Sequence, residues 1–149
     1  MSAPVNVHAT AIRINGTGLL FSGPSGWGKS MLAFTCLTEA KRIGLDAVLV
    51  ADDQVFLENR EGQIIARRPD SIAGLIELRG TGIVALDSIA EAAMHFAILP
   101  GSASGENRLP PENEQMEVAS GFLLPVIRLL GDTRLPLAVL MAKAPEIGR

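Results

Sequence analysis

A short glycine-rich segment carries the residues whose types and spacing most clearly suggest chemistry. Gly23-Pro24-Ser25-Gly26-Trp27-Gly28-Lys29-Ser30 has two glycines separated by four residues, followed by a lysine and a hydroxyl residue. Glycines permit a close backbone approach, so that successive N–H groups can converge on phosphate oxygens. Lys29 can then reach the terminal phosphates, and the Ser30 hydroxyl can coordinate Mg²⁺. The segment predicts a phosphate-binding loop, the alternative being a flexible glycine-rich turn with an unrelated lysine.

A phosphate-binding loop must follow a strand and open a helix. Leu19-Leu20-Phe21 supplies the strand. The segment Met31–Arg42 predicts the helix, because Leu32, Cys36 and Ala40 recur at a spacing of four. Gly44 is expected to end this helix.

The strand that leads into the loop is predicted to have an antiparallel partner. Asn15-Gly16 lies between the apolar segments Ala9–Ile14 and Gly18–Ser22, and Asn-Gly is the strongest short hairpin signal. We therefore expect an α/β fold in which a single P-loop domain, residues 1–149, is built on a mixed parallel and antiparallel sheet.

Two adjacent acids follow a buried strand. Ala47–Ala51 is continuously apolar, as in a strand covered on both faces, and it ends in Asp52-Asp53. Ligands of open α/β sheets bind at the carboxyl ends of strands, where phosphate-loop enzymes place an acid that positions Mg²⁺. One acid could face a metal and the other a nucleophile, whereas the alternative is a polar turn.

Three further charged residues are candidates for the site. Glu77 and Arg79 precede Gly80-Thr81-Gly82 and would share one face of a strand, either as an internal ion pair or as part of a site. Arg108 lies in the long polar segment Pro100–Gln115, from which it could move toward a phosphate.

The other elements are expected from turn signals and hydrophobic patterns. Pro125 places the strands of residues 118–130 at a sheet edge. The predicted elements are a hairpin of Val55–Glu58 and Gln63–Ala66, a short connection or helix over Ala85–Met94, a strand over His95–Leu99, and a helix over Leu137–Lys143 opened by Pro136.

Composition excludes several classes of protein. The formal net charge of −3 and the pI near 5.4 give no electrostatic reason to expect nucleic-acid binding. No apolar run is long enough to span a membrane, and the start of the chain lacks the pattern of a signal peptide. The single cysteine, Cys36, fits a reducing compartment. These features predict a cytoplasmic protein.

The order of these motifs resembles the HPr kinase/phosphorylase family, in the form of the catalytic domain alone and of the short proteobacterial type. The resemblance extends from about residue 5 to residue 143. The matching features are His8 fifteen residues before the loop, the loop Gly23–Ser30, Val50-Ala51-Asp52-Asp53, the signature Leu75–Ile83, and Arg108-Leu109.

The resemblance implies an ATP- and Mg²⁺-dependent serine kinase that phosphorylates the HPr phosphocarrier of the sugar phosphotransferase system, with a reverse phosphorylase reaction and a hexameric assembly. Asp53 would be the base for the seryl hydroxyl. The other implied catalytic residues are His8, Lys29, Arg79 and Arg108. The predicted metal site comprises Ser30, Asp52 and Glu77, and the predicted nucleotide-binding residues are those of the loop, 23–30.

Two other functions stay open. Met31 stands where most members of the family have an acidic residue, which favours a catalytically weak, nucleotide-binding regulatory module. A small-metabolite kinase is the other alternative, because the loop by itself specifies phosphate binding and not the acceptor.

Overall fold

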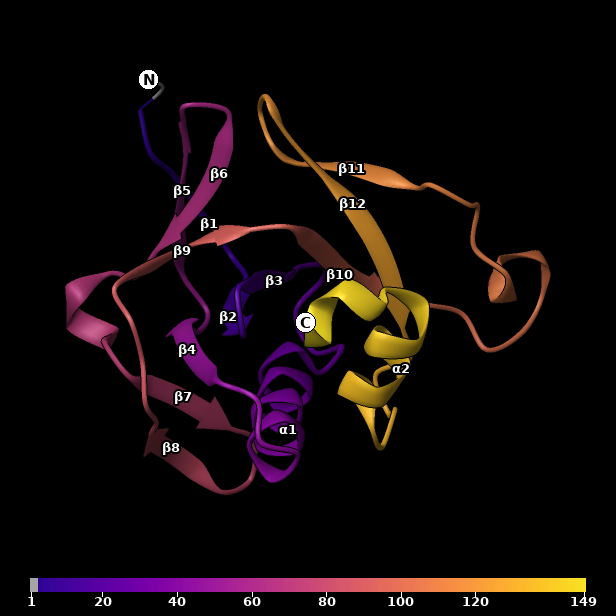
Figure 1. Cartoon of the computed structure of the whole chain (residues 1–149), viewed down its shortest axis with the longest axis horizontal. Coiled ribbons are helices and arrows are strands. Elements are labelled where there is room, and N and C mark those ends of the chain that lie inside the picture. Colours follow the sequence, from indigo (N-terminus) through magenta and orange to yellow (C-terminus); the bar gives the residue numbers. More distant parts are fainter. Residues whose placement is uncertain (1–2) are drawn as a thin grey trace.

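The computed structural model describes residues 3–149, which form twelve strands, two α-helices and three short 3₁₀ segments (Figure 1). The strands are β1 (Val5–Val7), β2 (Thr10–Ile14), β3 (Thr17–Phe21), β4 (Ala47–Ala51), β5 (Val55–Arg60), β6 (Gln63–Arg67), β7 (Leu75–Leu78), β8 (Gly82–Ala85), β9 (Glu91–Met94), β10 (Phe96–Pro100), β11 (Gln115–Ala119) and β12 (Phe122–Leu129). The helices are α1 (Lys29–Arg42) and α2 (Pro136–Lys143), with η1 (Asp70–Ile72), η2 (Glu106–Arg108) and η3 (Pro145–Gly148).

The central sheet has six strands in the order β11-β12-β10-β3-β2-β4. β10 pairs in parallel with β3 and with β12, whereas β2 is antiparallel to both β3 and β4. The Asn15-Gly16 turn joins β2 to β3, with Ile14 opposite Thr17. The predicted hairpin and the predicted mixed sheet are therefore both confirmed.

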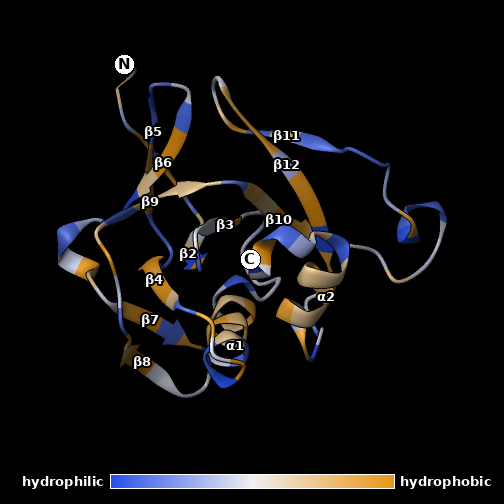
Figure 2. Cartoon of the chain, in the orientation of Figure 1, coloured by the Kyte–Doolittle hydropathy of each residue, from blue (hydrophilic) through white to orange (hydrophobic). Residues whose placement is uncertain are grey.

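The central sheet is covered on both faces. Alternate side chains of β2 and β3, such as Ile12, Leu19 and Phe21, pack with α1, α2 and η3 in one apolar cluster. Their neighbours Ala11 and Leu20 face a second cluster with the four-stranded sheet β1-β5-β6-β9. Because side chains alternate along a strand, apolar runs supply both cores at once. Figure 2 shows α1 with hydrophobic and hydrophilic stretches, as expected of a helix that covers one face of a sheet, whereas α2 is hydrophobic over most of its length.

The loop helix begins two residues earlier than predicted and ends as predicted. α1 includes Lys29 and Ser30. Gly44 has a φ of 82°, and Leu45 N–H donates to the carbonyl of Ala40 at 2.8 Å, so that the helix ends in a Schellman motif. The glycine stop expected from the sequence is confirmed.

The second hairpin also forms where the sequence predicts it. β5 and β6 pair with Arg60 opposite Gln63, and the turn residues Glu61 and Gly62 both have positive φ values. This is the backbone of the two-residue turn that matches the twist of the flanking strands.

Two predictions about local structure were wrong. The segment Ala85–Met94 contains no helix: it ends in β9, which completes the four-stranded sheet against β6. Arg79 does not share a strand face with Glu77, because β7 ends at Leu78 and the chain turns there toward β8. Tertiary pairing overrides local pattern in both places.

The placement of Pro125 at a sheet edge holds locally, although β12 as a whole is not the edge strand. β12 lies between β11 and β10. Its pairing with β10 begins only at Val126, so Pro125 precedes the stretch where a second neighbour would need its N–H group. Proline is tolerated there because no ladder hydrogen bond is lost.

No helix in residues 3–149 is long and apolar enough to cross a membrane.

The two sheets meet closely at Gly18, and this contact generates a prediction. A Cβ atom at Gly18 would lie 1.9 Å from the carbonyl oxygen of Ala93 in β9. The backbone N–H of His95 also donates to the Gly18 carbonyl, and the side-chain Nδ1 of His95 accepts from the Gly18 N–H.

We expect Gly18→Ala to lower the free energy of unfolding by about 1–3 kcal/mol, measured by urea denaturation with Trp27 fluorescence. Gly16→Ala is the matched control, because no atom lies within 4 Å of its Cβ position. Equal stabilities of the two variants would contradict the close approach.

Candidate active site

One cavity of about 400 Å³ brings together most of the residues that the sequence singled out. It lies at the carboxyl ends of β3 and β4, where the glycine-rich loop and the two acids follow their strands. Its lining residues are His8, Thr10, Ser25, Gly26, Gly28, Lys29, Ser30, Met31, Asp53, Glu77 and Arg79.

The loop backbone forms an open cradle. Gly26 and Gly28 have φ values of 89° and 109°, which favour glycine. A Cβ at Gly26 would meet no atom within 4 Å and would occupy the cavity, whereas one at Gly28 would lie 3.3 Å from the carbonyl oxygen of Gly131. The Gly131 segment therefore supports the loop from behind and leaves its open face free.

The remaining loop residues hold the loop in shape. Trp27 Nε1 donates to the carbonyl of Ser22 at 2.9 Å. The ammonium group of Lys29 donates to the carbonyls of Gly23 and Pro24 at 3.1 and 3.2 Å. Gly23, Pro24 and Trp27 do not line the cavity, so the structure gives them a shaping role in the loop.

Lys29 is a largely buried cation in the wall of the cavity. Burial lowers the pKa of its ammonium group, and the nearby carboxylates of Asp53 and Asp52 partly oppose that effect. Two loop carbonyls satisfy the ammonium group in the absence of a bound anion. A phosphate anion near Lys29 would therefore favour its charged form.

Asp52 lies at the centre of the site's hydrogen bonds and is only 6% exposed. Its Oδ1 accepts from the hydroxyls of Thr10 at 2.8 Å and Ser30 at 2.6 Å, and its Oδ2 accepts from the Glu77 N–H at 3.0 Å. Among residues 3–149, the only buried polar side chains are Thr10, Lys29 and Asp52. The polar interior of this protein is therefore concentrated at one site.

Asp53 has the opposite environment. Its side chain is 64% exposed, and its Oδ1 lies 3.0 Å from Nδ1 of His8. Its backbone φ of 73° is in the left-handed region, which aspartate tolerates better than most residues. The structure thus brings His8 and Asp53 together at the mouth of the cavity, although they are 45 positions apart in the chain.

Glu77 and Arg79 both line the cavity and are exposed. Among the ion pairs of the described residues, none joins these two side chains, so the internal ion pair considered from the sequence does not form. Both charged groups are free to meet a ligand.

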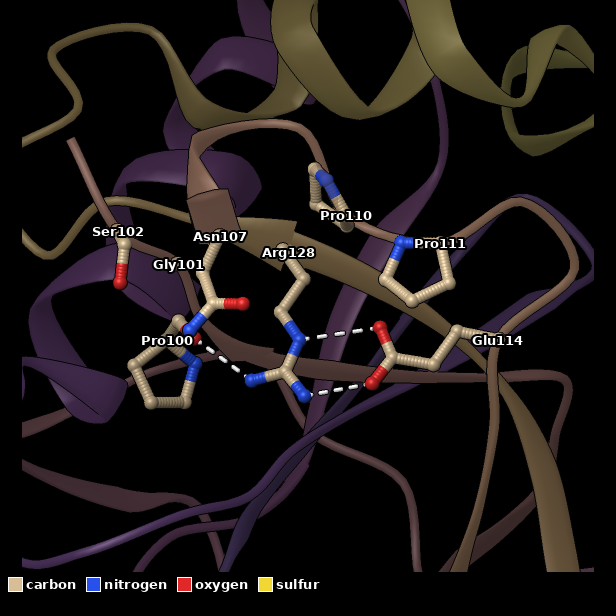
Figure 3. Close-up of a pocket in the computed structure, with 8 residues that line it drawn as sticks. All are labelled: Pro100, Gly101, Ser102, Asn107, Pro110, Pro111, Glu114 and Arg128. Atoms are coloured by element: carbon tan, nitrogen blue, oxygen red, sulfur yellow. Dashed lines mark hydrogen bonds and ion pairs between the residues drawn. The ribbon is translucent and has the colours of Figure 1, made fainter. Parts of the chain in front are cut away.

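Of the five predicted catalytic residues, Arg108 is the one that does not line the cavity. It lies in η2, within the long loop after β10, and lines a neighbouring hollow with Arg128 and Leu130. Figure 3 shows how this loop is anchored. Arg128 donates to both carboxylate oxygens of Glu114, at 3.1 and 2.6 Å, and to the carbonyl of Pro100 at 2.8 Å. The hydrogen bonds from Arg128 lower the pKa of Glu114, which keeps the pair ionised.

Sequence reasoning missed Thr10 and Gly131. Thr10 lies at the start of β2, where a hydroxyl residue gives no signal until its partner Asp52 is known. Gly131 supports the loop through a backbone contact across more than a hundred residues. Neither residue belongs to a local motif, so only the tertiary contacts reveal them.

The residues present fit a nucleotide with Mg²⁺. The cradle is open, and a hydroxyl and a carboxylate, which are oxygen donors of the kind that Mg²⁺ prefers, lie 2.6 Å apart at Ser30 and Asp52. Within the described part of the chain, no three His, Cys, Asp or Glu side chains gather into a group that could hold a metal. Mg²⁺ does not need such a group, because it commonly binds through one or two carboxylates together with water and phosphate oxygens.

Comparisons with known proteins agree with this arrangement. The HPr kinase/phosphorylase of Clostridium beijerinckii is 33% identical over 84 residues, which cover 56% of this chain and 26% of that protein. The HPr kinase/phosphorylase of Mycoplasma mycoides subsp. mycoides is 41% identical over 76 residues, covering 51% and 22% respectively. The chain thus spans about a quarter of the length of these curated relatives.

A solved structure, the Hpr(Ser) kinase/phosphatase from Coxiella burnetii, superposes with a TM-score of 0.74 and 21% sequence identity. The match covers 96% of this chain and 91% of that one, which confirms the predicted α/β fold with a mixed sheet over nearly the whole chain. The sequence model of the HPr Serine kinase C-terminal domain matches residues 1–93, a stretch that contains the loop Gly23–Ser30, both acids and the segment Leu75–Ile83. This chain belongs to the HPr serine kinase C-terminal domain family.

Proposed function

We propose that this protein is an ATP-dependent serine kinase that phosphorylates an HPr-like phosphocarrier protein. One observation carries the proposal: a phosphate loop and an exposed carboxylate paired with an imidazole line the same cavity. The first can bind the phosphate donor, and the second can accept the proton of a hydroxyl group. The similarity to proteins named HPr kinase/phosphorylase supports the choice of acceptor.

The loop residues bind and orient the donor. The N–H groups at the start of α1 and the ammonium group of Lys29 surround the phosphate position. Lys29 exchanges its two loop carbonyls for phosphate oxygens. Phosphoryl transfer needs little covalent help, so that positioning and neutralisation of charge supply most of the catalysis.

Asp53 is the residue we assign to the acceptor hydroxyl. His8 holds Oδ1 of Asp53 at 3.0 Å, which leaves Oδ2 free to accept the seryl proton. Its exposure lets a protein-bound serine reach it, whereas buried Asp52 has no access to one. A positioned base of this kind contributes typically ~10²–10⁴ in rate.

Ser30, Asp52 and Glu77 are the residues we assign to Mg²⁺. The ion would neutralise phosphate charge when bound. Asp52 fixes the Ser30 hydroxyl and the backbone at Glu77, so that both ligands are oriented before binding. Arg79 lines the cavity and would add positive charge near the place where the acceptor hydroxyl binds. Arg108 would reach the site by movement of its loop.

We also propose that the catalytic domain covers residues 1–149. The core that holds α1 and β2 includes Leu137, Leu140 and Ile147 from α2 and η3. Glu39 of α1 accepts hydrogen bonds from the N–H groups of Leu137 and Ala138, which ties the two helices together. A cytoplasmic location and self-association into hexamers follow from the same family proposal.

A nucleotide-binding module without transfer activity is the second candidate. Met31 favours it, because this exposed apolar side chain lines the cavity directly after the loop serine. Incubation with γ-labelled ATP and HPr distinguishes the candidates: label on a seryl residue supports the kinase, and nucleotide binding without transfer supports the module. Label on a small molecule would indicate a metabolite kinase.

The assignment of Asp53 predicts a selective loss of transfer. We expect Asp53→Asn to reduce phosphorylation of HPr by ~10²–10⁴ because the amide cannot accept the proton. ATP affinity, measured by calorimetry, should stay within about threefold of the parent. Asp87→Asn, an exposed acid that lies outside the cavity and pairs with Lys41, is the matched control. Normal turnover of Asp53→Asn would refute the assignment.

The assignment of Lys29 to the phosphates predicts instead a loss of ATP affinity. Lys29→Ala should weaken ATP binding by roughly 10- to 100-fold, since charge-assisted hydrogen bonds to phosphate are lost. Lys143→Ala, an exposed lysine in the last turn of α2, should leave the affinity unchanged. Titration calorimetry with a non-hydrolysable ATP analogue measures both, and unchanged affinity of Lys29→Ala would exclude its phosphate role.

A further inference from the structure

A hollow with two lobes lies on the side of the glycine-rich loop away from the two acids. Its lobes have volumes of about 250 and 380 Å³ and share Gly101, Ser102, Asn107, Pro110 and Arg128. The loop follows β3, the acids follow β4, and the hollow lies where β10 and β12 end. Because β3, β10 and β12 are parallel, the hollow and the loop lie at the same edge of the sheet, where ligands of α/β proteins bind.

Backbone contacts join this hollow to the glycine-rich loop. A Cβ atom at Gly23 would lie 3.0 Å from Cδ of Pro100, which lines the smaller lobe. On the other lobe, Leu130 precedes Gly131, whose carbonyl oxygen lies 3.3 Å from the Cβ position of Gly28 in the wall of the active-site cavity. Consecutive Cα atoms are about 3.8 Å apart, so only a thin wall separates the two spaces. One extended molecule can therefore occupy both.

The proposed direction of transfer points the donor toward this hollow. In phosphoryl transfer the attacking and leaving oxygens lie roughly in line, on opposite sides of the transferred group. The attacking hydroxyl is assigned to Asp53, after β4. The leaving part of the donor must then lie on the side away from β4, which in the sheet order is the side of β10 and β12.

The walls of the hollow suit a flat heterocycle. Three proline rings, Pro100, Pro110 and Pro111, line the smaller lobe around the guanidinium group of Arg128 (Figure 3). Arg128 is fixed by its hydrogen bonds to Glu114 and to the Pro100 carbonyl, and its side chain is still 32% exposed. A fixed, accessible guanidinium plane is a surface on which a nucleobase stacks.

The polar groups of the hollow favour a neutral occupant. Glu114 matches the charge of Arg128, so that the pair offers little attraction to an anion. The exposed side chains of Ser102 and Asn107 line both lobes. An amide presents a donor and an acceptor together, which matches the N6 and N7 edge of adenine. The larger lobe also lies within the roughly 300–1,000 Å³ of small-molecule pockets.

We propose that this hollow binds the adenine base of ATP, stacked on Arg128 and hydrogen-bonded by Asn107. The inference rests on the proposed nucleotide-binding function and deepens it. It gives the long loop after β10 a role in the choice of phosphate donor. Phosphate contacts and base contacts are then made by different segments, the first by the glycine-rich loop and the second by the ends of β10 and β12.

Asn107→Ala tests the subsite through a comparison of two ligands. We expect its affinity for ATP to fall about three- to tenfold, because hydrogen bonds to the base are lost. Its affinity for methyl triphosphate, which carries the phosphates without a nucleoside, should equal that of the parent. Titration calorimetry with Mg²⁺ measures both. Asn6→Ala is the matched control, since this exposed asparagine lies on β1, outside the hollow.

A second measurement uses GTP, whose base presents two acceptors, O6 and N7, in place of the donor and acceptor of adenine. The parent should bind ATP more tightly than GTP, and Asn107→Ala should reduce that preference. Equal affinities of the parent for ATP and GTP would contradict recognition of the adenine edge by Asn107.

The outcomes separate the subsite from the kinase function. Seryl labelling of HPr by the parent together with an unchanged ATP affinity of Asn107→Ala overturns the subsite alone. An equal loss of ATP and methyl triphosphate affinity also overturns it, since the change would then lie at the phosphates. A selective loss of ATP affinity without seryl labelling by the parent supports the subsite and overturns the kinase. Failure of the parent to bind either ligand overturns both.

Discussion

The carboxylate of Asp52 is the interaction on which the site depends. A buried charge is costly unless hydrogen bonds compensate it, and this one has three. Its partners come from the start of β2, the start of α1 and the middle of β7, whereas Asp52 itself follows β4. Four segments distant in sequence are thus held around one group. Loss of any partner would leave the carboxylate less satisfied, so the position of each segment is coupled to that of the others.

Two adjacent aspartates acquire different chemical capacities from their surroundings alone. Asp52 is buried directly after β4, whereas Asp53 has a positive φ and an exposed side chain beside His8. Burial and hydrogen bonds fix the first, which suits a structural or metal-binding role. Exposure and a single imidazole partner leave the second available to an incoming group. This arrangement makes the division of labour suggested by the sequence physically reasonable.

The layered fold explains why the loop is supported on one side and open on the other. α1 and α2 pack on one face of the central sheet, and the Gly131 segment that connects β12 to α2 supports Trp27 and Gly28 from behind. The open face has no such neighbour, and a Cβ at Gly26 would meet nothing. Preorganisation of this kind reduces the entropy lost when an anion binds. The C-terminal part of the chain therefore supports the glycine-rich loop, although none of the loop residues lies in that part.

The sequence by itself determined the local features: the glycine-rich loop between a strand and a helix, the Asn15-Gly16 turn, a second hairpin turn within residues 59–62, the Gly44 helix stop and the acids after a buried strand. Each of these depends on residues close together in the chain, where dihedral preferences and apolar periodicity act. Only the tertiary structure decided that Ala85–Met94 ends in a strand, that Arg79 leaves the strand, that Thr10 bonds Asp52 and that His8 meets Asp53. The reason is that strand pairing, burial and side-chain contacts join residues tens of positions apart, and no local pattern records their partners.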